Sequence, residues 1–142
     1  AGTRDRLTGY LQELARVGID SSSVPVYETA NDAASTKAGL ETIFGSAHPP
    51  TAILAMSDRM ALVALEWLSA RKLNVPNDVS IVGFDGVPET AVSEPPLTTV
   101  AQPIAELGRL AVKAIFENDG TTNRQQLPVE LIVRASSAPP RG

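Results

Sequence analysis

The stretch VSIVGFDG at residues 79–86 decides the fold of this chain, because it is almost wholly apolar until it ends in Asp85 and Gly86. A short apolar run bounded by turn residues is typical of a parallel strand that is buried on both faces. In an open α/β sheet, ligands bind beyond the carboxyl ends of such strands. Asp-Gly is also a common turn dipeptide, so the pair fits either a plain turn or a ligand-binding carboxylate.

Composition bounds the class of protein. The chain has 142 residues, of which 43% are hydrophobic and 20% charged, as expected for one compact domain. A net charge of -4 argues against a nucleic-acid-binding surface within this segment. With no Cys and one His, we expect no thiol chemistry, disulfide, metal site or cofactor. The longest apolar run (60–65) is too short for a membrane span and no export signal opens the chain, so we expect a cytoplasmic protein.

Strand-like and helix-like segments alternate along the first part of the chain. The expected elements are a helix at 4–17, a strand at 24–28, a helix at 31–44 capped by Asn31 or Asp32, a strand at 51–56, a helix at 59–71 and a strand at 79–84. This alternation predicts an α/β fold: a doubly wound, mostly parallel sheet with helices on both faces.

The pattern changes beyond Gly86. We expect a loop at 87–96, a short strand in TTVA, a helix at 103–117, a turn at 118–123 and a last strand near VELIV (129–133).

The expected helix at 59–71 is apolar around most of its circumference. Leu62, Val63 and Trp67 lie on the face opposite Ala61 and Leu65. A helix of this kind is covered on two sides. The second cover is either a loop of the same chain or a partner subunit, and the short loops favour the partner.

Enzyme chemistry is disfavoured by the residues at the strand ends. Ser57 lies in AMSDR and not in a G-x-S-x-G elbow, and His48 lies in a Pro-rich turn. No phosphate-binding glycine loop is present. Asp58 is predicted to cap the helix that follows, which leaves Asp85 without a second acid for glycosidase chemistry.

Recognition without turnover fits better. Ser57 and Asp85 each follow a predicted parallel strand and should lie at the same edge of the sheet. A carboxylate accepts hydrogen bonds from hydroxyl groups, and the guanidinium groups of Arg4 and Arg6 donate to oxygens. This set suits a sugar-like ligand.

Several longer motifs then carry a resemblance over nearly the whole chain. They are RLTGYLQELARVGI (6–19), PTAILAMSDRMALVALEWL (50–68), LNVPNDVSIVGFDG (73–86), PPLTTVAQP (95–103), ELGRLAV (106–112) and ELIVRASSAPP (130–140). With these motifs the chain resembles the effector-binding part of lactose-repressor-type (LacI/GalR) transcription regulators, which share the type I periplasmic-binding-protein fold.

The resemblance implies roles for individual residues. Asp85 matches the aspartate that holds effector hydroxyls, and Ser57 stands where the family often has an Asn that contacts effector. One or both of Arg4 and Arg6 would face the cleft between subdomains. Gln102 would lie near the effector at a hinge crossover.

An aromatic that stacks on the sugar is missing from its usual place, where this chain has Ala34, and Tyr27 is the alternative. The helix after Asp58 would form the dimer interface, with Leu62 at its centre and Val63 and Trp67 beside it.

The resemblance also implies what the whole protein does. Residues 1–142 would form part of one effector-binding and dimerisation domain, with about 98–120 in its N-terminal subdomain. Operator DNA would be bound by a helix-turn-helix outside this chain. The chain itself would start just after the first strand of the C-terminal subdomain. The expected function is effector sensing in a homodimeric regulator, most simply a repressor; the alternative is a solute-binding protein of a sugar uptake system.

Overall fold

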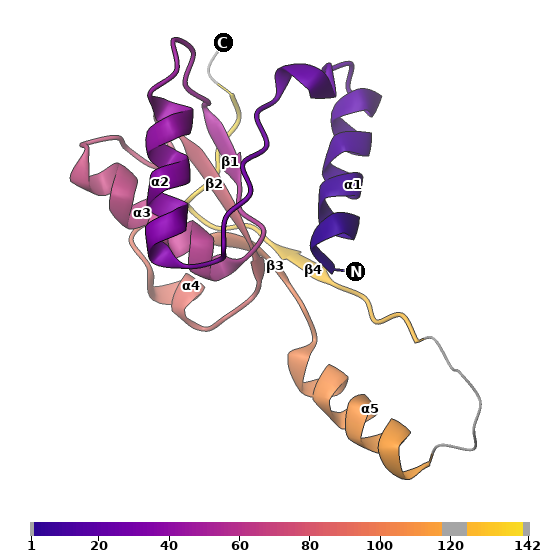
Figure 1. The fold of residues 1–142 in the computed structure, drawn as a ribbon. Helices are drawn as coiled ribbons and strands as arrows, with labels where there is room; N and C mark the ends of the chain where they lie inside the picture. Colours follow the sequence, from indigo (N-terminus) through magenta and orange to yellow (C-terminus); the bar gives the residue numbers. More distant parts are fainter. Residues whose placement is uncertain (1, 118–124, 141–142) are drawn as a thin grey trace.

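The computed structural model describes residues 2–117 and 125–140 and centres on a four-stranded sheet (Figure 1). The strands lie in the order β1-β2-β3-β4; the first three are parallel and β4 joins antiparallel to β3. Their bounds are Ala52–Leu54 for β1, Ser80–Asp85 for β2, Thr98–Ala101 for β3 and Glu130–Ile132 for β4. The predicted α/β class with a mostly parallel sheet is confirmed.

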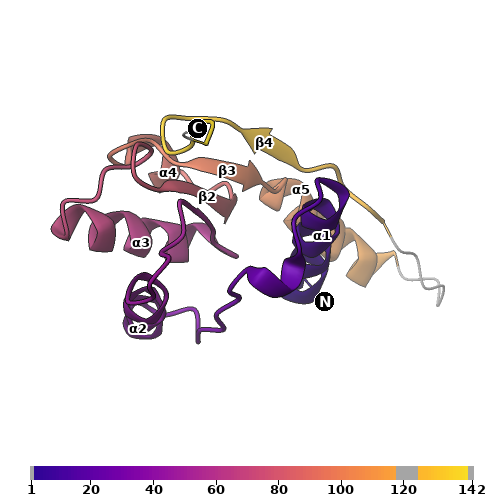
Figure 2. The ribbon, with the colours of Figure 1, turned by 90° about the horizontal axis from the view of Figure 1, so that it is seen from above.

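Two helices build the core on one side of the sheet. Helix α3 (Asp58–Ala70) packs on β2, and α2 (Ala33–Phe44) packs on α3. Figure 2 shows α3 between the strands and α2. The side chains of Leu68, Ile81 and Leu97 are fully buried where these layers meet. The second face of α3 is therefore covered to a large extent by α2 of the same chain.

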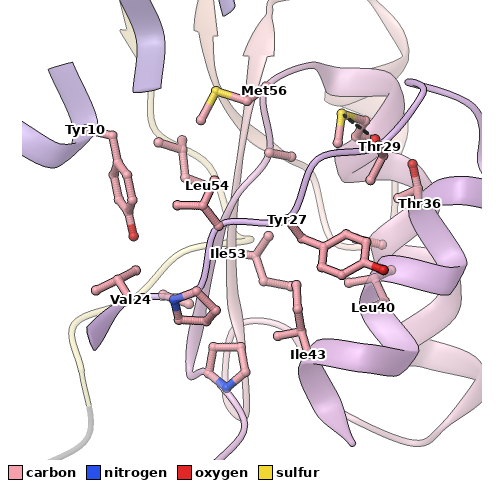
Figure 3. Close-up of a pocket in the computed structure, with 18 of the residues that line it drawn as sticks. Tyr10, Val24, Tyr27, Thr29, Thr36, Leu40, Ile43, Ile53, Leu54 and Met56 are labelled. Atoms are coloured by element: carbon pink, nitrogen blue, oxygen red, sulfur yellow. Dashed lines mark hydrogen bonds between the residues drawn. The ribbon is translucent and has the colours of Figure 1, made fainter. Parts of the chain in front are cut away.

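Helix α1 (Gly2–Arg16) confirms the helix predicted at 4–17, and a short 3-10 turn, η1 (Ser21–Ser23), follows it. The strand predicted at 24–28 is wrong, because these residues join no ladder. A strand needs a hydrogen-bonded neighbour, whereas residues of this segment and of β1 line one apolar groove without forming a ladder (Figure 3). Val26 and Tyr27 keep the β-type composition but remain about half exposed.

The segment after β2 contains one element that the sequence did not predict and one strand that it did. The loop at 87–96 contains a single helical turn, α4 (Glu89–Val92). Strand β3 pairs with β2 from Val82↔Thr98 to Asp85↔Ala101, so the strand predicted in TTVA is confirmed as part of the main sheet.

Helix α5 (Ile104–Phe116) extends away from the sheet and has no buried residue (Figure 1). Ile115 and Phe116 on this helix are largely exposed. The turn expected at 118–123 lies outside the described residues.

Candidate functional site

Arg6 joins the carboxyl ends of the first two strands. Its Nη1 donates a hydrogen bond of 2.5 Å to the carbonyl of Met56, just beyond β1. Its Nη2 lies 3.6 Å from Oδ1 of Asp85, at the end of β2. The guanidinium carbon stands 3.9 Å above the centre of the Phe84 ring, a cation–π distance. Arg6 is therefore held from three directions, with about a fifth of its side chain exposed.

Asp85 and Gln102 form the other half of this cluster. Nε2 of Gln102 donates to Oδ1 of Asp85 at 2.8 Å, and the Gln102 backbone N–H donates to the Asp85 carbonyl at 3.1 Å. Asp85 has a φ of +122°, a region that L-residues rarely occupy. The Arg6–Asp85–Gln102 cluster thus presents one cation, one anion and one amide at the edge of the sheet.

Ser57 follows β1 at the same edge but is already engaged. Its hydroxyl accepts from the Met60 N–H at 3.3 Å, which makes Ser57 the N-cap of α3, and donates to Oδ1 of Asn31 at 2.8 Å. Asn31 is a polar residue that the sequence reasoning considered only as a helix cap; Asp32 caps α2 instead. Asn31 has a φ of +58°, a conformation that Asn tolerates better than most residues.

The prediction that Asp58 caps α3 is wrong. Its side chain turns into the protein, where it is fully buried. One carboxylate oxygen accepts from the N–H groups of Gly86 at 2.6 Å and Val87 at 2.9 Å, and the other accepts from the Thr99 hydroxyl at 2.5 Å. Ser57 caps the helix because its hydroxyl already reaches the first-turn N–H, which frees the Asp58 carboxylate for these three donors.

Two other expected ligand contacts are not brought to the cluster. Arg4 is exposed on the first turn of α1. Tyr27 packs its ring against Gly39 of α2 and lines the apolar groove beside β1 (Figure 3). The groove and the cluster abut at Met56, whose side chain lines the groove while its carbonyl binds Arg6.

Of the three residues expected at a dimer interface, Trp67 is the one buried within the chain itself. Trp67 is only 4% exposed, because it packs against Phe44 of α2 with ring centres 5.3 Å apart and donates from Nε1 to Glu41 at 3.2 Å. It therefore has almost no surface left for a second chain. Leu62 and Val63 are partly buried and keep some exposed surface on α3.

Among the described residues, no group of three or more His, Cys, Asp and Glu side chains could hold a metal ion. The helices within 2–117 and 125–140 include none with the length and apolar character needed to cross a bilayer.

The cluster geometry can bind a polar, uncharged molecule. Arg6 and Asp85 neutralise one another, so a ligand needs no net charge to enter. At 3.6 Å their pair is longer than a hydrogen bond, so both groups keep capacity for ligand oxygens and hydroxyls.

Comparison with known proteins places this arrangement in a family. A family model described as "Periplasmic binding protein-like domain" matches residues 1–137. The chain belongs to this family. The transcriptional repressor CytR of Escherichia coli is 39% identical over 140 residues, and the regulator DegA of Bacillus subtilis is 34% identical over 142. These alignments cover 93% and 97% of this chain but only 40% and 42% of the two relatives.

Solved structures agree with the sequence comparison. The lac repressor dimer, bound to operator and an anti-inducer, superposes with a TM-score of 0.83 at 30% identity and covers 96% of this chain and 48% of its own. A complex of the regulator CelR with cellobiose has a TM-score of 0.81 at 33% identity, covering 93% and 42%. The resemblance to LacI-type regulators is therefore confirmed, and the chain spans about half or less of the proteins that it matches.

Proposed function

We propose that this chain is the effector-sensing part of a LacI-type transcription regulator and that it binds a small, hydroxyl-rich ligand, a sugar or sugar derivative by preference. Binding would occur at the Arg6–Asp85–Gln102 cluster. Operator DNA would be contacted by another part of the intact cytoplasmic protein. Neither turnover nor a cofactor is part of this function.

The observation that carries the proposal is the position of Asp85. It lies at the carboxyl end of a central parallel strand, beside a guanidinium and a side-chain amide. Ligands of open α/β sheets bind at this edge. A carboxylate accepts two hydroxyl hydrogen bonds, while Arg6 and Gln102 donate to ring or hydroxyl oxygens.

The relatives support the class of ligand. One is described as the ribose operon repressor of Haemophilus influenzae, at 32% identity over 114 residues, and the CelR structure contains cellobiose. Ribose and cellobiose therefore serve as the first two probes, and the departures from the family pattern at Ser57 and Ala34 are reasons to test both.

The test is a calorimetric titration of the intact protein with each sugar. Where the wild type binds, Asp85→Ala should lose roughly 2–4 kcal/mol of affinity, because hydrogen bonds to a charged group are stronger than neutral ones. Glu106→Ala, which removes an exposed carboxylate from α5, is the matched control and should bind like wild type. Wild-type affinity in Asp85→Ala would exclude Asp85 as a ligand contact.

We also propose that the intact protein is a homodimer in which α3 contributes Leu62 and Val63. Both side chains are partly buried in the chain and retain apolar surface. In a twofold dimer each such residue is buried twice, which doubles the gain from a small patch.

A further inference from the structure

The turn that follows Asp85 is held by a carboxylate from a different element. Asp58, the first residue of α3, binds the N–H groups of both Gly86 and Val87 through one oxygen. Its other oxygen accepts from Thr99 in the middle of β3. One fully buried side chain thus ties the start of α3, the end of β2 and strand β3 together.

The surrounding sequence leaves room for this carboxylate. A Cβ atom at position 83 would overlap Oδ1 of Asp58 and would stand 3.1 Å from Leu97. Gly83 is therefore required for the Asp58 side chain to reach the turn. Gly86 has a φ of +80°, and a Cβ there would come within 2.6 Å of Ala101.

The turn needs such an anchor, because its backbone is strained. Asp85 has a φ of +122°, and residues in sparsely populated regions persist only where their surroundings hold them. The Gln102 N–H holds the carbonyl side of Asp85, and Asp58 holds the two N–H groups that follow. These two sets of hydrogen bonds lie on either side of Asp85.

We propose that Asp58 is a positioning residue of the ligand site. By binding the Gly86 and Val87 N–H groups it keeps Asp85 in its strained conformation, with the carboxylate beside Gln102 and Arg6. The link to ligand binding rests on the proposed function, whereas the effect of Asp58 on Asp85 can be measured without any ligand. Ligand affinity should therefore respond to Asp58 although this residue is buried and reaches the site only through the turn.

The test uses amide hydrogen exchange and the side-chain amide resonance of Gln102 in the full chain. In Asp58→Ala, exchange at Gly86 and Val87 should be roughly 10- to 100-fold faster, the loss expected for bonds to a charged acceptor. The Gln102 resonance should move toward that of a free glutamine, because Asp85 relaxes away from it.

Two milder variants keep the test decisive if Asp58→Ala does not fold. Asp58→Asn can still accept from both N–H groups while its amide donates to the Thr99 hydroxyl, but a neutral oxygen holds the two N–H groups less strongly than a carboxylate does. Exchange at Gly86 and Val87 should therefore rise about tenfold, and the Gln102 resonance should move part of the way toward that of a free glutamine. Thr99→Val removes the third hydrogen bond only and should leave the turn unchanged, which controls for loss of stability in general.

Two results would overturn the assignment: unchanged exchange at Gly86 and Val87 in Asp58→Asn, or equal acceleration in Thr99→Val. Titration with ribose and cellobiose then separates the two proposals. If neither sugar binds the wild type, the proposed ligand class fails while the exchange data still decide the role of Asp58. If one binds, Asp58→Asn should weaken it about tenfold and Thr99→Val should not.

Discussion

Replacing Trp67 with Ala should destabilise the chain by about 4 kcal/mol, because a Trp→Ala change in a core typically costs 3–5 kcal/mol. Trp67 is 4% exposed, stacks at a tilt on Phe44 and carries the Arg71 guanidinium 3.7 Å above its ring. The substitution also removes the hydrogen bond that the Trp67 Nε1 donates to Glu41. Small domains are stable by roughly 5–15 kcal/mol, so this loss would remove a large share of the free energy of unfolding.

The assay is urea unfolding followed by circular dichroism over about a hundredfold range of protein concentration. Because α2 of the same chain covers Trp67, the loss of stability should not depend on concentration. Trp67→Phe keeps an aromatic ring against Phe44 and should lose less than half as much. A loss below about 1 kcal/mol, or one that shrinks as the protein is concentrated, would refute the assignment of Trp67 to the intrachain core.

Three further predictions concern separate features of the chain. Leu62→Lys should convert the dimer of the intact protein to monomer in sedimentation, since an unpaired buried charge costs several kcal/mol; a persistent dimer would contradict the interface. The Ser35 N–H donates to the Asp32 carboxylate and lowers its pKa, so this cap stabilises the fold above the unfolded-state pKa of Asp32. That stabilisation is lost as the pH falls through the folded-state pKa. Asp32→Ala should therefore make the urea midpoint depend less on pH between neutral and acidic conditions. The 142-residue chain, with its net charge of -4, should not retard a DNA duplex selectively at about 150 mM salt.

Periodic apolar patterns predicted most of the fold. The helix predicted at 59–71 and the strand predicted at 79–84 appear within a residue or two of their expected bounds. In both, the spacing of the apolar residues along the sequence matches the face that is buried in the fold. The segment at 24–28 failed because β-type composition gives a strand only where a partner edge lies within hydrogen-bonding reach. No property of VPVYE itself reveals whether such an edge is present.

At the site, the sequence predicted the edge of the sheet but not the contacts along it. Asp85 and Gln102 lie beside one another because the parallel strands β2 and β3 end on one side of the sheet, and Arg6 reaches Asp85 from α1. Arg4 does not join them, because Arg6 is the arginine whose guanidinium reaches Met56, Phe84 and Asp85. A choice between two arginines two positions apart depends on how α1 is rotated, which the sequence pattern leaves open.

The helix-capping preference predicted the wrong residue at the start of α3, where Ser57 and not Asp58 is the N-cap. Either residue can cap a helix, and the rule favoured the carboxylate. The hydroxyl of Ser57 meets the capping requirement with one short side chain. Burying a carboxylate is costly unless donors surround it, and Asp58 finds three of them near the positive end of the α3 dipole. Because Ser57 already caps α3, the helix does not require the buried carboxylate of Asp58. The proposed role of Asp58 in holding the strained turn next to Asp85 accounts for its burial.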